Sequence, residues 1–292
     1  MTEPALLILA AGRARRFGGI KPLAPIGPSG EAVIDLLAHD AVTAGFTRIA
    51  IVINDTTGPV IKEHIAQHWN LDQLKVDFAV QDEPHGTVHA VLAASEVIAG
   101  SAFAVSNADD LYGPAALAHL YNHLSSNASE NAMVAFQLER TLVGSSPVTR
   151  GVCHIDQDGR LVGIDERRGV HRDENGTIAV DDGLSPAVLD PTLRVSMNLW
   201  AFASGMWPVF ARAMAEHDLA TGEVLLPVVV DHLIHGTMAG VDTALRTISV
   251  YTSDENCVGV THPGDLELVQ QHIIEQVDAG NRAKVLSGSL YR

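Results

Sequence analysis

The chain has 292 residues, of which 47% are hydrophobic and 18% are charged, so it is long enough to bury a large core. Its formal net charge is −16 at pH 7, from 19 Lys and Arg against 35 Asp and Glu. This balance excludes a nucleic acid and an anionic membrane surface from the expected partners. A small anion can still bind where basic side chains and backbone N–H groups gather.

Cysteine usage and the first apolar run bear on the compartment. Cys153 and Cys257 are far apart and lack metal-ligand spacing, which predicts free thiols and suits the reducing cytoplasm. The run from Ala5 to Ala11 is too short to span a bilayer, and the basic segment Arg13 to Arg16 follows it. We therefore expect a cytoplasmic protein with no targeting sequence and no membrane segment.

In the first half, short apolar runs alternate with longer amphipathic segments, which predicts βα units around a mainly parallel sheet. The strands are expected at Ala5–Leu9, Arg48–Ile53, Lys75–Val80, 102–106 and 132–138. Helices are expected at 32–44, 59–69, 87–99 and 114–124, where apolar residues recur at three- and four-residue spacing.

After about Gly144 the pattern changes to a predicted hairpin of 151–155 and 161–165, joined by a turn that ends in Asp158-Gly159. The acidic stretch 172–183 is expected to be an exposed loop. Further strands are predicted at Arg194–Phe202 and 247–251, and helices at 207–216, 224–235 and 263–279.

The loop after the first strand combines small residues with basic ones. It reads Leu9-Ala10-Ala11-Gly12-Arg13-Ala14-Arg15-Arg16-Phe17-Gly18-Gly19-Ile20-Lys21-Pro22. Ligands of open parallel sheets bind at the carboxyl ends of the strands, and N–H donors with fixed positive charge are what a triphosphate needs. The alternative is a surface loop with solvated arginines.

The loop after the third strand contains Gln81 and, five residues later, Gly86. A glycine lets a planar base approach the backbone closely, and a Gln amide can donate to and accept from a base edge. The alternative is that Gln81 is a surface residue at a strand end. His85 and His89 are expected to be loop and helix-face residues rather than ligands.

The fourth strand ends in Asp109-Asp110. Adjacent carboxylates at the end of a buried strand repel each other unless a cation compensates, so Mg²⁺ bound to phosphate oxygens is a natural explanation. The alternative is that one of the two acids caps a helix that starts near Pro114.

The run from Leu9 to Lys21 resembles the N-terminal signature of nucleotidyltransferases that activate sugar 1-phosphates, and it looks most like a bacterial subgroup whose substrates are often unassigned. Ala14 departs from it, because a second glycine is usual there. The resemblance implies a Rossmann-like three-layer α/β/α fold with a mixed, mainly parallel sheet. It implies a single domain over 1–279, with a nucleotide-binding half of about 1–143, a sugar-binding half of about 144–279, and a C-terminal tail over 280–292.

By the same resemblance, Arg16 and Lys21 contact the phosphates and are catalytic together with Asp109, which also binds Mg²⁺. The implied nucleotide-binding residues are Leu9, Ala10, Ala11, Gly12, Arg13, Gln81, Pro84, Gly86, Thr87 and Asp109. Gln81 resembles the pyrimidine-reading version of its loop, which favours UTP or dTTP, although one Gln can also serve adenine.

The implied sugar-binding residues are Asp110, Gly151, Glu166, Arg167, Ser196, Asn198 and Glu223. Arg167 replaces the family's usual Lys at the sugar phosphate, although a Glu-Arg-Arg run alone is typical of a solvated face. Ser196 and Asn198 stand where an Asn and a Gly are usual. Glu223 is either a sugar-hydroxyl acceptor or an acid that stabilises a helix start.

Many relatives carry a second metal-binding Asp at the position of Gly259. Asp110 and Asp265 are the candidate substitutes, and Asp265 is more simply explained as the cap of the last helix.

The leading hypothesis is an Mg²⁺-dependent nucleotidyltransferase that moves a nucleoside monophosphate from an NTP to a sugar 1-phosphate or a sugar-like cyclitol phosphate, releasing pyrophosphate. Its partners are these small phosphates, and a homo-oligomer is a family-level expectation. The alternatives are a nucleotidyltransferase acting on a non-sugar phosphate and a non-catalytic nucleotide or sugar-nucleotide sensor. A glycosyltransferase is disfavoured because the basic loop suits an intact triphosphate.

Overall fold

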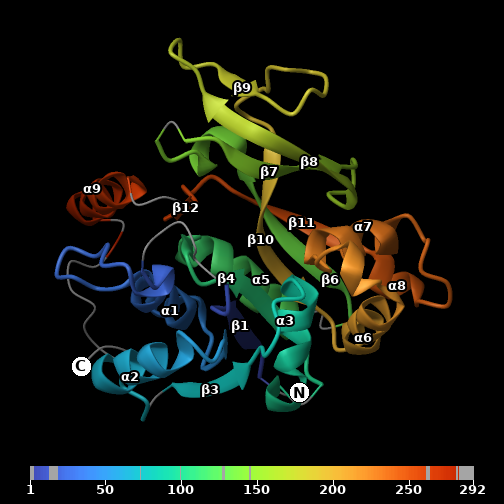
Figure 1. Cartoon of the computed structure of the whole chain (residues 1–292), viewed down its shortest axis with the longest axis horizontal. Coiled ribbons are helices and arrows are strands. Elements are labelled where there is room, and N and C mark those ends of the chain that lie inside the picture. The colour runs from blue at the N-terminus through green and yellow to red at the C-terminus, as the bar shows by residue number, and fades with distance from the viewer. Residues whose placement is uncertain are drawn as a thin grey trace.

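A mixed β-sheet organises the molecule (Figure 1). The structure is a computed structural model that describes residues 3–12, 19–72, 74–98, 100–126, 129–144, 146–260, 264–280 and 282. Its strands are β1 Ala5–Leu9, β2 Arg48–Ile53, β3 Lys75–Val80, β4 Phe103–Asn107, β5 Asp110–Leu111, β6 Asn131–Gln137, β7 Val148–Ile155, β8 Leu161–Arg172, β9 Ile178–Val180, β10 Arg194–Phe202, β11 Ile248–Ser253 and β12 Val258–Gly259.

The central strands are mainly parallel. Strands β3, β2, β1 and β4 pair in parallel in that order, and β6 pairs in parallel with β11. Between these two groups lies β10, which is antiparallel to both β4 and β6. The small strands β5 and β12 form a separate antiparallel pair.

Helices cover both faces of the sheet. They are α1 Val33–Ala44, α2 Gly58–His68, α3 Thr87–Ala93, α4 Ser95–Ile98, α5 Pro114–Ser126, α6 Met206–Glu216, α7 Leu226–Ile234, α8 Thr243–Arg246 and α9 Asp265–Asp278, with 3-10 turns at Lys21–Leu23, Leu138–Thr141 and Leu219–Thr221. Along β1, Leu6 and Ile8 pack in one core with α1, α2, α5 and α9, whereas Ala5 and Leu7 pack in a second core with α3, α6 and α7. This alternation gives the three-layer α/β/α fold that the sequence predicts.

Strand β10 belongs to two parts of the sheet. Its first half pairs with β7, through Val195 and Ser196, and its second half pairs with β4, from Trp200 to Phe202. The register shifts between these halves, and there Asn198 has a φ of 61°, the only positive φ of a non-glycine among the described residues. Strands β7, β8 and β9 continue from β10 as an arm at the top of Figure 1.

Several predicted elements are confirmed with their bounds, namely β1, β2, β3 and β10. The helix expected over 87–99 is instead broken at Ala94 into α3 and α4. The exposed loop expected over 172–183 is wrong, because β8 runs on to Arg172 and pairs with β9. In β9, Ile178 and Val180 are buried against Val170 and Val195, so a small apolar core holds this hairpin.

Candidate functional site

The loops after β1, β3 and β4 meet at the carboxyl edge of the sheet, where two cavities adjoin. The nucleotide-side cavity, of about 520 Å³, lies among these three loops. The acceptor-side cavity, of about 510 Å³, lies between this edge, the arm and α7. Thr87, Asn107 and Asp109 line both cavities, so a molecule in one would contact a molecule in the other near these side chains.

The nucleotide-side cavity brings together most residues predicted to bind a nucleotide. Those that line it are Leu9, Ala11, Gly12, Gln81, Pro84, Gly86, Thr87 and Asp109. Ala10 lies in a smaller hollow of about 150 Å³ that it shares with Lys21 and Asp109. Arg13 and Arg16 lie outside the described residues.

Gly86 is required where the β3 loop meets the segment before α7. Its φ is 100°, and a Cβ there would overlap the carbonyl oxygen of Val224. Val224 donates its N–H to the His85 oxygen at 2.9 Å and accepts from the Val88 N–H at 3.0 Å. These contacts place Glu223 in the nucleotide-side cavity, whereas the sequence analysis placed it on the sugar side. The tertiary contact with Gly86 decides its position.

The Gln81 side chain is 7% exposed and has a defined orientation. Its Nε2 donates to the Gly86 oxygen at 3.2 Å and lies 3.3 Å from His89 Nδ1. No described residue donates a hydrogen bond to its Oε1. Because Gln81 lines the cavity, it offers an acceptor to a ligand there. His89 Nδ1 also lies 2.8 Å from the Glu83 oxygen, so this histidine holds the loop.

Lys21 and Asp109, predicted from two separate loops, lie together. Lys21 Nζ is 3.5 Å from Asp109 Oδ2; Asp109 lines both cavities, and Lys21 lines the acceptor-side cavity. The Asp109 side chain is 36% exposed, which leaves it accessible to a ligand. The pair offers a cation and a carboxylate where phosphate groups would meet.

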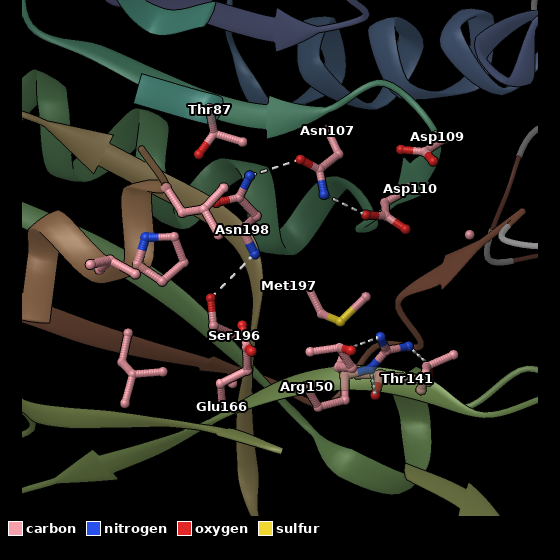
Figure 2. A pocket seen from close by; sticks show the side chains of 18 of the residues that line it. Thr87, Asn107, Asp109, Asp110, Thr141, Arg150, Glu166, Ser196, Met197 and Asn198 are labelled. Carbon is pink, nitrogen blue, oxygen red and sulfur yellow. Dashed lines mark hydrogen bonds between the residues drawn. The ribbon is translucent and has the colours of Figure 1, made fainter. Parts of the chain in front are cut away.

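Asp110 is held by a chain of amide hydrogen bonds, shown in Figure 2. Asn107 Nδ2 donates to Asp110 Oδ2 at 2.9 Å, and Asn198 Nδ2 donates to Asn107 Oδ1 at 2.8 Å. Trp200 Nε1 in turn donates to Asn198 Oδ1 at 2.9 Å. Burial and the charge of Asp109 raise the pKa of Asp110 to about 6. Asn198 lines the cavity, but its amide is already engaged in this chain.

The alternative that Asp109 or Asp110 caps α5 is wrong, because another acid accepts a hydrogen bond from the first turn of this helix. Glu255 Oε2 accepts the Ala116 N–H at 3.1 Å, within the first turn of α5. Asp109 and Asp110 are therefore not needed for that helix.

The donor set at Asp109 and Asp110 fits a hard divalent cation. Among the described residues no three His, Cys, Asp or Glu side chains cluster as a metal site. Two carboxylates, completed by phosphate oxygens and water, are a common way to bind Mg²⁺. Gly259 pairs with Asp110 across β5 and β12, and a Cβ at 259 would overlap Asp110 Oδ1. Asp110 therefore fills the place of a side chain at 259. Asp265, the first residue of α9, lines the acceptor-side cavity, as do Asp110 and Gly259.

The acceptor-side cavity contains the predicted sugar-side residues Asp110, Gly151, Glu166, Ser196 and Asn198. It also contains Arg150, which precedes Gly151 in the segment that resembles the family's sugar side and to which the sequence assigned no role. Arg150 Nε donates to Thr141 Oγ1 at 3.0 Å and Nη2 to the Thr141 oxygen at 2.5 Å (Figure 2). Burial lowers the pKa of Arg150, and the Asp110 charge opposes that effect.

The expectation that Arg167 holds an acceptor phosphate is corrected. Ile164 and Glu166 on β8 line the cavity, whereas Arg167 does not. Arg167 Nε donates to Asp182 Oδ2 at 2.6 Å, and its Nη2 donates to the Pro186 oxygen at 2.8 Å. Neighbouring residues on a strand point to opposite faces, and here Glu166 faces the cavity whereas Arg167 faces Asp182 on the other side of β8.

Cys153 and Cys257 are free and buried, as predicted. Burial raises the pKa of Cys153 to about 12 and that of Cys257 well above its ordinary value. Neither thiol is therefore a nucleophile near neutral pH.

A family model described as the MobA-like NTP transferase domain matches residues 6–217, more than half of the chain. No curated protein matches the chain. Within the residues that the structure describes, no helix has the length and apolar character needed to cross a bilayer.

Proposed function

The chain belongs to the MobA-like NTP transferase family, and on this premise we propose that it transfers a nucleoside monophosphate from an NTP to a sugar 1-phosphate or a sugar-like cyclitol phosphate, releasing pyrophosphate. The observation that carries this proposal is the meeting of two cavities of similar size at Asp109, whose carboxylate is paired with Lys21. One cavity would hold the NTP and the other the acceptor, and the α-phosphate would lie at their boundary.

The reaction needs alignment and charge neutralisation more than proton transfer. An acceptor phosphate oxygen attacks the α-phosphorus and forms a new P–O bond, while the bond to the β-phosphate oxygen breaks and its electron pair leaves with pyrophosphate. A phosphate monoester is already anionic near neutral pH, so no protein base has to activate it. Lys21 supplies positive charge at the boundary, and Arg16 is proposed to do the same for the NTP phosphates.

Asp109 is the residue that would hold a divalent cation, which we propose to be Mg²⁺. When bound, Mg²⁺ would neutralise phosphate charge and orient the phosphate oxygens. Lys21 is the ion-pair partner of Asp109 and would lie beside the bound cation.

UTP or dTTP is the proposed nucleotide, and the orientation of Gln81 supports it. Its Nε2 is engaged by Gly86, so Oε1 is the atom available to a base. Uracil and thymine present an N3–H that can donate to this oxygen. An exocyclic amine of adenine or cytosine can also donate to it, and pyrophosphate release from each of the five NTPs distinguishes these bases.

The lining of the acceptor-side cavity supports a hydroxylated ring as acceptor. Ile164 and Val228 offer apolar surface, and Glu166 and Asp231 offer carboxylates to hydroxyl groups. Among the described residues, Arg150 and Lys21 line this cavity and offer positive charge to an acceptor phosphate. Free buried thiols are compatible with the cytoplasm as its location.

Pyrophosphate release tests the proposal. Purified protein with Mg²⁺ is given ATP, GTP, CTP, UTP or dTTP, each against a panel of sugar 1-phosphates and cyclitol phosphates. Asp109→Asn should abolish the release, and Asp158→Asn, an exposed acid in the β7–β8 turn, is the matched control. Tight NTP binding without release from any pair would instead favour the sensor.

A further inference from the structure

The pairing of β5 with β12 sets Asp110 directly against Gly259. A Cβ at 259 would overlap Asp110 Oδ1 and would lie 2.9 Å from the backbone oxygen of Asp109. Any residue other than glycine there would displace the Asp110 carboxylate. The Asp110 carboxylate can therefore take its position only because residue 259 has no side chain.

The Asp110 carboxylate is held firmly on one side only. Its Oδ2 accepts from Asn107, whose backbone N–H is bonded to Tyr112 Oη at 3.0 Å. The Tyr112 hydroxyl donates onward to the Met197 oxygen at 3.0 Å, next to Asn198. Both the side chain and the backbone of Asn107 are therefore fixed by β10 and its neighbours.

The other oxygen, Oδ1, lies toward Gly259 and accepts no hydrogen bond from a described residue. No described cation forms an ion pair with Asp110. Arg150 is bonded to Thr141 and Thr149, Lys21 is paired with Asp109, and their charges lower the pKa of Asp110 less than burial and Asp109 raise it. A carboxylate beside a second negative charge is unfavourable unless a cation compensates. The fixed orientation of the carboxylate and the open Oδ1 together make this oxygen suited to coordinate a metal ion.

We propose that Asp110 is the second carboxylate ligand of the divalent cation held by Asp109, that Gly259 leaves the space for it, and that Asn107 and Asn198 are its positioning residues. This inference rests on the proposed function, because it assumes that the cation acts on an NTP bound beside Asp109. It assigns to Asp110 a role at the metal rather than at the sugar.

Mn²⁺ binding to the full-length protein provides a readout that does not depend on turnover. It is measured by the decrease of the electron paramagnetic resonance signal of free Mn²⁺. Asp110→Asn should raise the Mn²⁺ dissociation constant about tenfold or more, and Asp158→Asn should leave it unchanged. Thermal unfolding of each variant shows that it is folded. Asn removes the charge but keeps the shape, so Asn107 can still hold the side chain.

An exchange of the two positions tests the shared space. Gly259→Asp alone should weaken Mn²⁺ binding, because its side chain displaces Asp110. Combined with Asp110→Gly, it should restore most of the affinity, since one carboxylate then fills the same space from the other strand. A folded double variant that binds Mn²⁺ no better than Asp110→Gly would overturn the claim that the two positions share one ligand place.

The remaining outcomes separate this inference from the proposed function. If wild-type protein releases pyrophosphate and Asp109→Asn loses Mn²⁺ binding, while Asp110→Asn binds Mn²⁺ within twofold of wild type, the second ligand is refuted and the function stands. If wild-type protein binds Mn²⁺ through both acids but releases no pyrophosphate from any substrate pair, the metal assignment stands and the transferase function fails.

Discussion

Arg167 and Asp182 form an ion pair with both side chains 6% exposed, and it lies away from the acceptor-side cavity. The guanidinium also reaches the backbone oxygens of Leu184 and Pro186, so it ties β8 to the segment that follows β9. Arg167 therefore stabilises the arm.

The first prediction concerns stability in acid. The hydrogen bond from Arg167 holds the pKa of Asp182 well below its ordinary value of 3.8. The folded state thus binds the proton more weakly than the unfolded state, so the pair stabilises the fold above about pH 4 and this contribution is lost as the pH falls below it. Urea unfolding from pH 3 to pH 7 should show a smaller loss of stability on acidification in Asp182→Asn than in wild type. Parallel curves for the two proteins would contradict the pair's role.

The second prediction separates Arg150 from Arg167 in function. Arg150→Lys should raise KM for the acceptor about tenfold, because a point charge replaces a fixed planar group in the acceptor-side cavity. Arg167→Lys should leave that KM near its wild-type value and lower the melting temperature instead. Steady-state kinetics and calorimetry on both variants check this. A raised acceptor KM in Arg167→Lys with an unchanged KM in Arg150→Lys would show that Arg167, and not Arg150, binds the acceptor.

The third prediction concerns the nucleobase. Gln81→Leu removes the acceptor Oε1 and should lower kcat/KM for the preferred NTP about tenfold, the scale of one lost hydrogen bond. It should lower kcat/KM less for a nucleotide that makes no use of this oxygen. Gln157→Leu, in the exposed β7–β8 turn, serves as the control. Equal losses for all five NTPs would mean that Gln81 shapes the loop and does not read the base.

The fourth prediction concerns Gly86. Gly86→Ala combines a positive φ with an overlap against the Val224 oxygen, whereas Gly176→Ala has a φ of 81° and open space around its Cβ. The second variant should show backbone strain alone, about 1 kcal/mol, and the first should cost clearly more free energy of unfolding. Gly86→Ala should also weaken NTP binding because it moves Glu223. Equal losses of stability in the two variants would show that the close approach to Val224 carries no weight.

The fifth prediction concerns Asn198. Glycine tolerates a φ of 61°, so Asn198→Gly keeps the backbone and removes the amide that donates to Asn107 and accepts from Trp200. Thermal stability should fall moderately, because the buried Trp200 Nε1–H loses its acceptor, and the Mn²⁺ dissociation constant of the folded variant should rise severalfold through the misplaced Asp110. Normal Mn²⁺ affinity in this variant would mean that Asn107 holds Asp110 without help.

Strands β1 and β2 could be predicted from sequence because their apolar runs are buried on both faces. Strand β3 also matches its predicted bounds, although it lies at the edge of the sheet and is less buried. The candidate site loops could be predicted once the strands were placed, because ligands of parallel sheets bind at the carboxyl ends of the strands. The face that a residue occupies was harder to predict. Arg167 was expected at the acceptor phosphate because it stands where the resembled family has a Lys, but β8 continues to Arg172 and the Arg167 side chain lies on the face that meets Asp182.

The remaining site residues depend on contacts between distant segments. Glu223 is placed by the backbone of Val224 against Gly86, and Arg150 is placed by Thr141. No local spacing encodes either contact. The role of Gly259 is similar, because only the pairing of β12 with β5 shows which side chain occupies its space.

Strand β10 has a consequence for how this molecule could be divided. Because it pairs with β4, β6 and β7, it supplies a shared central strand to the sheet and to the arm. A fragment that stops before Arg194 would leave the edges of β4 and β6 unpaired at once, and such edges promote aggregation. The arm is thus unsuited to exchange as a cassette between related enzymes unless β10 moves with it, and a graft that keeps the host's own β10 would inherit the host's residue at 198.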